Sequence, residues 1–109
     1  PADAAARAAA LRHAEVGDAM HKFGNDDSAF DAYHKSLTAL DKLAGERGAA
    51  GVNCEAGMIL RKVGRIAEMR LKGNEPAEFI KAMFGDLKNI EGLVTEEVKR
   101  LSGSGRGME

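Results

Sequence analysis

The 109-residue sequence has little cysteine, few aromatic residues and almost no net charge, and each shortage narrows what the chain can be. Its single cysteine, Cys54, excludes a disulfide within the chain and favours a reducing compartment, so we expect a cytoplasmic protein. With no tryptophan, one tyrosine and four phenylalanines, a core of Leu, Ile, Val, Met and Ala is expected. No apolar run has the length of a membrane span or the strength of a signal peptide.

The chain also lacks an excess of positive or negative charge. Sixteen basic and seventeen acidic side chains leave a formal charge of −1. No overall field therefore draws the chain to nucleic acid or to an anionic membrane, and such binding would have to be local. A core built from so short a chain is small, so we expect either a homo-oligomer that associates through the last predicted helix, at about 76–101, or attachment to a larger chain.

Helical periodicity fills most of the sequence, and the alternation typical of strands does not. It predicts one all-α domain over residues 1–101, with helices at about 3–23, 27–47, 52–72 and 76–101 and a flexible tail at 102–109. The breaks between helices read GNDD, GERGAAG and KGNEP. Because short breaks favour antiparallel neighbours, we expect two helical hairpins, either stacked as an open array or closed into a four-helix bundle.

Each predicted helix has an apolar stripe that its neighbours are expected to bury. In the first helix the stripe is Ala9, Val16, Met20 and Phe23, whereas Leu11 and Ala14 lie on a different face. The other stripes are Phe30, Tyr33, Leu37, Leu40 and Ala44, then Val52, Ala56, Ile59, Val63 and Ile66, then Phe79 or Ile80, Met83, Leu87, Ile90, Val94, Val98 and Leu101.

Local signals predict where the helices begin and bend. Asp26 or Asp27 is expected to cap the second helix. Pro76 suits the first turn of the fourth, where its missing N–H costs nothing. Gly85 and Gly92 each cost that helix about 1 kcal/mol relative to alanine, so they indicate close packing or a bend.

Two stretches of the chain are alike, VGDAMHKFGNDDSAF and, about 48 residues later, VGRIAEMRLKGNEPAEF. The first resembles a tetratricopeptide repeat, a hairpin of two antiparallel helices. Val16 and Gly17 fall where the family places a leucine and a small residue, and Met20 stands where it usually has a tyrosine. Gly24 lies at the position of the family's turn and Ala29 at its tight helix crossing. Tyr33 occupies the position of its large aromatic residue, and Ser36 that of its second small residue. The second hairpin departs from the pattern, since Ala67 replaces the large residue and two extra residues precede Gly73. Asp41 also replaces the proline that closes a repeat.

The resemblance implies a non-enzymatic adaptor or scaffold module that binds a partner segment along its first and third helices. By position, the partner-binding residues are His21, Lys22, Arg61, Arg65 and Met69, with Glu68 beside them and apolar contacts from Leu11, Ala14 and Met58. Arg61 and Arg65 are four residues apart and share a helix face, so together they suit an acidic peptide. The plainer interpretation is that RKVGR is the solvated side of an amphipathic helix.

Two other functions stay open from the sequence. The run RKVGRIAEMRLK is basic enough for a small oligomeric nucleic-acid-binding protein, although Glu68 interrupts it and no aromatic is interleaved for stacking. An all-α metal-dependent nucleotide hydrolase needs a Glu-x-x-Glu pair, and only Glu75 and Glu78 provide one. His13 and His21 lack the spacing of paired helical ligands, and Cys54 has no partner nearby. We expect no cofactor, no metal and no catalytic residue.

Overall fold

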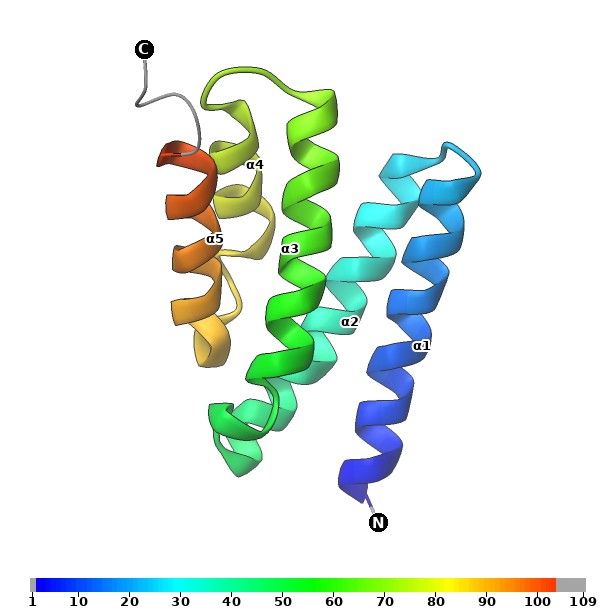
Figure 1. Ribbon diagram of the computed structural model, residues 1–109. Coiled ribbons are helices and arrows are strands. Elements are labelled where there is room, and N and C mark those ends of the chain that lie inside the picture. Colours follow the sequence, from blue (N-terminus) through cyan, green and yellow to red (C-terminus); the bar gives the residue numbers. More distant parts are fainter. Residues whose placement is uncertain (1, 104–109) are drawn as a thin grey trace.

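The computed structural model describes residues 2–103, and it is built from helices (Figure 1). The elements in chain order are α1 (Ala2–Lys22), α2 (Asp26–Arg47), the short 3-10 helix η1 (Ala49–Gly51), α3 (Asn53–Arg70), α4 (Glu75–Phe84), a second 3-10 helix η2 (Lys88–Ile90) and α5 (Glu91–Gly103). These residues contain no strand, which confirms the predicted all-α class.

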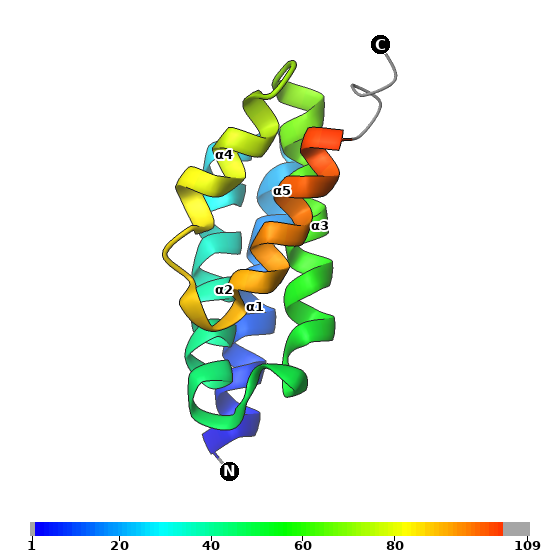
Figure 2. The same ribbon diagram turned by 90° about the vertical axis from the view of Figure 1, so that its left-hand side faces the viewer.

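The helices alternate in direction and follow one another across the molecule. Figures 1 and 2 show α1, α3 and α5 running one way and α2 and α4 the other. In Figure 1, α1 forms one edge and α4 with α5 the other, with α2 and α3 between them. Both α1 and α3 pack on α2, whereas α4 and α5 pack on α3 and on each other.

The prediction of four helices is wrong, because the segment expected as one helix over 76–101 forms two. α4 ends at Phe84, and the chain turns through Gly85 to Leu87 before η2 and α5. The cause is a contact from α2: Asp41 Oδ1 accepts hydrogen bonds from the backbone N–H of Asn89 at 2.8 Å and of Ile90 at 3.1 Å. These bonds begin α5 in a new direction while its apolar residues still reach the core.

The end of the chain also differs in part from the expectation. Ser102 and Gly103 belong to α5 rather than to the flexible tail predicted at 102–109. Residues 104–109 of that predicted tail lie outside the described residues.

Most of the predicted apolar stripes form the core. The stripes of α2 and α3 are buried apart from Phe30, which is half-buried. Its ring packs against that of Phe79 of α4, with ring centroids 4.7 Å apart and the planes tilted by 56°. The buried members of the last stripe are Ile80, Leu87, Ile90, Val94 and Leu101. The core is therefore made by α2 and α3 in the middle of the array, closed by α4 and α5.

The predicted apolar face of the first helix is wrong. α1 meets α2 through Ala10, Ala14 and Gly17, and Val16 and Phe23 remain 48% and 82% exposed. The reason is the close approach of the two helices, because a Cβ on Gly17 would stand 2.6 Å from the ring of Tyr33. Small residues therefore form the closest contact of α1 with α2. Of the predicted stripe, Met20 is partly buried against the core, whereas Val16 and Phe23 face outward.

The turn between α1 and α2 uses the expected residues in different roles. Gly24 adopts a φ of +84°, which favours glycine. Asn25, rather than an aspartate, caps α2 by accepting a hydrogen bond from the Ser28 N–H at 3.2 Å. Asp26 is instead buried in the first turn of α2, where His21 at 2.7 Å and Arg70 at 3.1 Å pair with it. Pro76 lies in the first turn of α4, as predicted.

Candidate functional site: the groove between α1 and α3

A groove runs between α1 and α3, with α2 beneath it. It consists of two adjoining hollows that share Asp18 and Lys62. The first hollow is also lined by Leu11, Ala14, Glu15, Glu55, Met58 and Ile59, and the second by His21, Tyr33, Arg65, Ile66 and Met69. We call this surface the α1/α3 groove.

Ion pairs tie the two walls of the groove together. Asp18 of α1 pairs with Lys62 of α3 at 3.0 Å, and Arg7 of α1 pairs with Glu55 of α3 at 2.6 Å. All four side chains are partly exposed, so each pair contributes about 0–1 kcal/mol to stability. Their main effect is on geometry, because they set the spacing of two helices that otherwise meet chiefly through α2.

The centre of the groove is a polar cluster of Asp18, Lys62 and Tyr33. The buried Tyr33 hydroxyl donates a hydrogen bond of 2.6 Å to Asp18 Oδ1. Burial and this bond raise the pKa of Tyr33 above its ordinary value. Partial burial raises the pKa of Asp18, but the hydrogen bonds from Tyr33 and Lys62 outweigh it, so that pKa lies below its usual range. Tyr33 is therefore neutral and Asp18 ionised at pH 7.

The second hollow combines exposed apolar surface with positive charge. Met69 is 66% exposed beside the buried Ile66. His21 is held by Asp26, whereas Arg65 is exposed and forms no ion pair with any residue of the described chain. Arg65 is thus the cation in this hollow that is free to bind an acidic group.

The first hollow is mainly apolar. Leu11 is 41% exposed and Met58 is 59% exposed, and they stand over the buried Ala14 and Ile59. The α1/α3 groove therefore has an end where exposed apolar residues adjoin Glu15 and Glu55, a polar centre, and an end where apolar surface adjoins a cation.

The structure brings together three of the five residues predicted to bind a partner. His21, Arg65 and Met69 line the same hollow of the groove. Lys22 instead borders a hollow on α1 beside Phe23, and Arg61 borders another on the opposite side of α3, facing α5. Arg61 and Arg65 both lie on the exposed face of α3. Arg61 borders the hollow toward α5 and Arg65 borders the α1/α3 groove, so they do not line one cavity.

Two residues of the groove could not be predicted from the sequence, and Glu68 was expected there but lies elsewhere. Glu68 contacts Arg100 of α5 at 3.4 Å and so faces away from the groove. Asp18 and Lys62 form its centre, although neither was a predicted site residue. Their separation of 44 positions leaves no local pattern, so only the packing of α1 and α3 on α2 could have revealed the pair.

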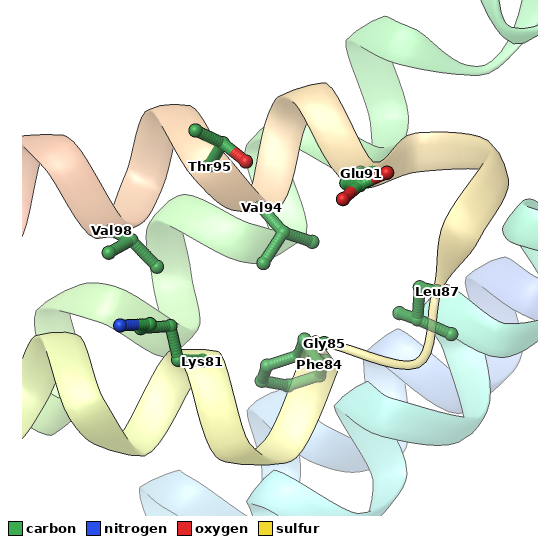
Figure 3. A pocket seen from close by; sticks show the side chains of 8 residues that line it. All are labelled: Lys81, Phe84, Gly85, Leu87, Glu91, Val94, Thr95 and Val98. Atoms are coloured by element: carbon green, nitrogen blue, oxygen red, sulfur yellow. The ribbon is translucent and has the colours of Figure 1, made fainter.

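A second cavity lies between α4 and α5. Figure 3 shows Phe84 and Val94 facing each other across it, with Lys81 and Glu91 near its rim. Phe84, Leu87 and Val94 are buried, while Lys81 and Glu91 are exposed. This cavity has apolar walls like the groove, but it belongs to the contact that holds α4 and α5 together.

The residues considered for metal binding lie apart. His21 pairs with Asp26, His34 pairs with Asp86 at 3.5 Å, and Cys54 is exposed near the start of α3. Within residues 2–103, no three His, Cys, Asp or Glu side chains are grouped as a metal site.

No helix within residues 2–103 has the length and apolar character that a membrane span requires. Comparison of the chain with protein-family models, with curated proteins and with solved structures found no match.

Proposed function

We propose that the protein is a helical protein-binding module whose α1/α3 groove takes a partner segment with both acidic and apolar residues. The observation that carries this proposal is an unpaired cation in a groove with exposed apolar side chains. Leu11, Met58 and Met69 are each more than two-fifths exposed there, and Arg65 is free of ion pairs within the described chain. Exposed apolar side chains gathered in one groove are typical of interaction sites.

The position of Arg65 at one end of the groove sets the orientation in which a partner segment would bind. A carboxylate beside Arg65 forms charge-assisted hydrogen bonds, which are stronger than those between neutral groups. The apolar residues of the partner then lie over Met69 and, past the Asp18–Lys62 pair, over Leu11 and Met58. From Met58 to Met69 the helix rises by about 16 Å, which matches about five extended residues or three helical turns.

Contacts in the first hairpin support the resemblance to a tetratricopeptide repeat, which stays a prediction. Gly17 lies against the ring of Tyr33, and Ala29 is fully buried. The buried Ser36 hydroxyl donates a hydrogen bond of 2.6 Å to the Ala10 carbonyl. Small residues at these positions let α1 and α2 approach closely, and this approach leaves the groove between α1 and α3.

Nucleic-acid binding has less support. In the basic run, Lys62 pairs with Asp18 and Arg70 with Asp26, so part of its charge is already neutralised. Arg61 and Arg65 face different hollows and make no continuous strip along which a phosphate backbone would run. The hydrolase alternative has no geometric support from the pair Glu75 and Glu78, because Glu75 accepts a hydrogen bond from the Lys72 N–H at 3.0 Å.

The separation of Arg61 from Arg65 supplies a matched control for the test. A displayed library of random 12-residue peptides is selected on the protein, and the affinities of the selected peptides are measured by fluorescence anisotropy. We expect the selected peptides to combine Asp or Glu with Leu, Phe or Met. Arg65→Glu should weaken their binding at least tenfold, whereas Arg61→Glu, which makes the same change on the same helix, should alter it less than twofold.

Two results would contradict the proposal. One is a selection that yields no peptide of this composition. The other is an equal loss of affinity in both variants while circular dichroism shows them to be folded, because that result makes the effect one of net charge rather than of the groove.

A further inference from the structure

The outer edge of α1, on the side away from α3, carries a largely apolar stripe whose two large residues, Val16 and Phe23, are exposed. Its residues are Ala5, Ala9, Arg12, Val16 and Ala19 of α1 and Phe23 directly after the helix; Ala9 and Ala19 are half-buried. The steps between them are four, three, four, three and four, which is the spacing of a seam between two packed helices. Phe23 is 82% exposed and Val16 48%, and Figure 1 shows no element beyond α1 on this side.

This stripe is complementary to itself when a second copy is placed antiparallel. Such a pairing sets residues whose numbers add to 28 opposite each other. Phe23 then meets Ala5, Ala19 meets Ala9, and the aliphatic stem of Arg12 lies over Val16. Each large side chain is thus opposite a small one or a flexible one, which a parallel pairing, with Phe23 against Phe23, does not provide.

The charges beside the stripe fit the same arrangement. Neither Arg12 nor Glu15 forms an ion pair within residues 2–103, and both are exposed. In the antiparallel pair, Glu15 lies between the Arg12 three residues before it and the Arg12 of the second copy. Two arginines and two glutamates therefore alternate around the two-fold axis, and their charges cancel.

We propose that this outer edge of α1 is a self-association surface, on which a second copy of the chain packs antiparallel. This inference goes beyond the proposed function, because it adds a second surface on α1. That surface adjoins the groove, and Glu15 lies at the boundary between the two. The contact involves one helix from each copy, so it lies at the lower end of interface size. We expect dissociation in the range of about 1–100 μM.

The test is sedimentation equilibrium over a concentration series, with variants placed on two sides of the same helix. The wild type should sediment as a monomer–dimer mixture. Val16→Glu puts a charge in the seam and should weaken the dimer at least tenfold. Leu11→Glu makes the same kind of change on the groove side of α1 and should change the dissociation constant less than twofold.

A charge exchange tests the arginine–glutamate cluster. Arg12→Glu and Glu15→Arg should each weaken the dimer, because each leaves four like charges at the axis. The double variant restores the alternation and should recover dimerisation to within threefold of the wild type. A double variant no better than the single ones would overturn the role assigned to this cluster.

Cross-linking tests the direction of the two helices. In a Cys54→Ser background, chains with Ala9→Cys and chains with Ala19→Cys are mixed and oxidised. Antiparallel packing predicts disulfides between the two kinds of chain, and parallel packing predicts them within each kind. The proposal is overturned by a monomer at all concentrations to 500 μM, by equal effects of the two glutamate variants, or by the parallel pattern of disulfides.

Discussion

Glycine 17 determines how closely α1 and α2 approach, and its counterpart in α3 acts in the same way. A Cβ at Gly17 would meet the ring of Tyr33, which is buried and cannot move aside. A Cβ at Gly64 would collide with the carboxylate of Glu97, which is paired with Arg100 of the same helix at 2.6 Å. Each half of the chain thus has a glycine where two helices pack closely. The ring of Tyr33 covers Gly17, and the Glu97–Arg100 ion pair covers Gly64.

Alanine substitutions of the glycines separate packing from helix propensity. Gly17→Ala should lower the free energy of unfolding by about 1–2 kcal/mol, because overpacking costs more than the propensity gain of about 1 kcal/mol. Gly57→Ala, inside α3 with no atom near the added Cβ, should raise it by about 0.5–1 kcal/mol. Urea denaturation measures both. Stabilisation by Gly17→Ala would contradict the close contact of α1 with α2.

The hydrogen bond between Tyr33 and Asp18 predicts a pH dependence at both ends of the scale. The raised pKa of Tyr33 gives stability that is present below the unfolded value of about 10 and lost as pH rises through the folded value. The lowered pKa of Asp18 gives stability that is present above about 4 and lost as pH falls through the folded value.

Comparison with Tyr33→Phe isolates this bond. The difference in free energy of unfolding between the wild type and the variant should be constant near neutrality and should shrink below pH ~4 and above pH ~10. Denaturation at intervals across this range provides the measurement. A difference that does not vary with pH would mean that the Tyr33 hydroxyl contributes through packing alone.

At the scale of the elements, Asp41 joins the two halves of the array. Its side chain caps the start of η2, and its carbonyl accepts a hydrogen bond of 3.1 Å from the Asn89 side chain. Asn89 in turn lies over Gly45, where a Cβ would stand 2.7 Å from the Asn89 amide nitrogen. α2 therefore fixes where α5 begins, although the two are far apart in sequence.

Removal of this cap should loosen α5 selectively. Asp41→Ala is expected to cost about 1–2 kcal/mol of stability, as the loss of a helix cap does, and to speed amide hydrogen exchange in η2 and the first turn of α5. Asp31→Ala is the matched control on α2, since Asp31 is exposed and makes no such contact within residues 2–103; it should stay within about 0.5 kcal/mol of the wild type. Equal exchange in both variants would contradict the capping role.

Much of the secondary structure could be predicted from periodicity, and the failures have physical causes. α2 and α3 bury the residues expected of them because Leu, Ile and Val at helical spacing leave one choice of face. In α1 the small Ala10, Ala14 and Gly17 form the buried face, so a search for large apolar residues chose the wrong side. The apolar stripe from Ile80 to Leu101 is shared by two helices, because α4 and α5 both pack on α3. The turn between them is held by Asp41 of α2, which lies outside this segment, so the periodicity of the segment did not predict the break.

The site was harder to predict than the helices. Arg65 and Met69 could be placed from their position on the third helix, and the structure sets them beside His21. Arg61 was paired with Arg65 on spacing alone, but four residues leave an offset of about 40° between the two side chains. That offset is enough for Arg61 to border the hollow facing α5 while Arg65 borders the groove. The Asp18–Lys62 pair at the centre forms because α1 and α3 both pack on α2. The sequence pattern of a single helix therefore does not predict it.

Over the whole molecule, α1 takes part in two adjoining surfaces. The α1/α3 groove offers Arg65 with exposed apolar residues, and the outer edge of α1 offers a self-complementary stripe. A dimer through that edge would carry two grooves, one on each copy. Linked sites bind a partner with repeated segments more tightly than one site does.

A map of amide chemical-shift changes shows directly whether the α1/α3 groove is the surface that binds a partner segment. The 15N-labelled protein is titrated with the tightest peptide from the selection. We predict changes concentrated at groove residues of α1 and α3, around Leu11, Met58, Arg65 and Met69, with little change around Val94 between α4 and α5. Changes concentrated at the α4/α5 cavity or along Val16 and Phe23 would contradict the claim and move the binding surface elsewhere.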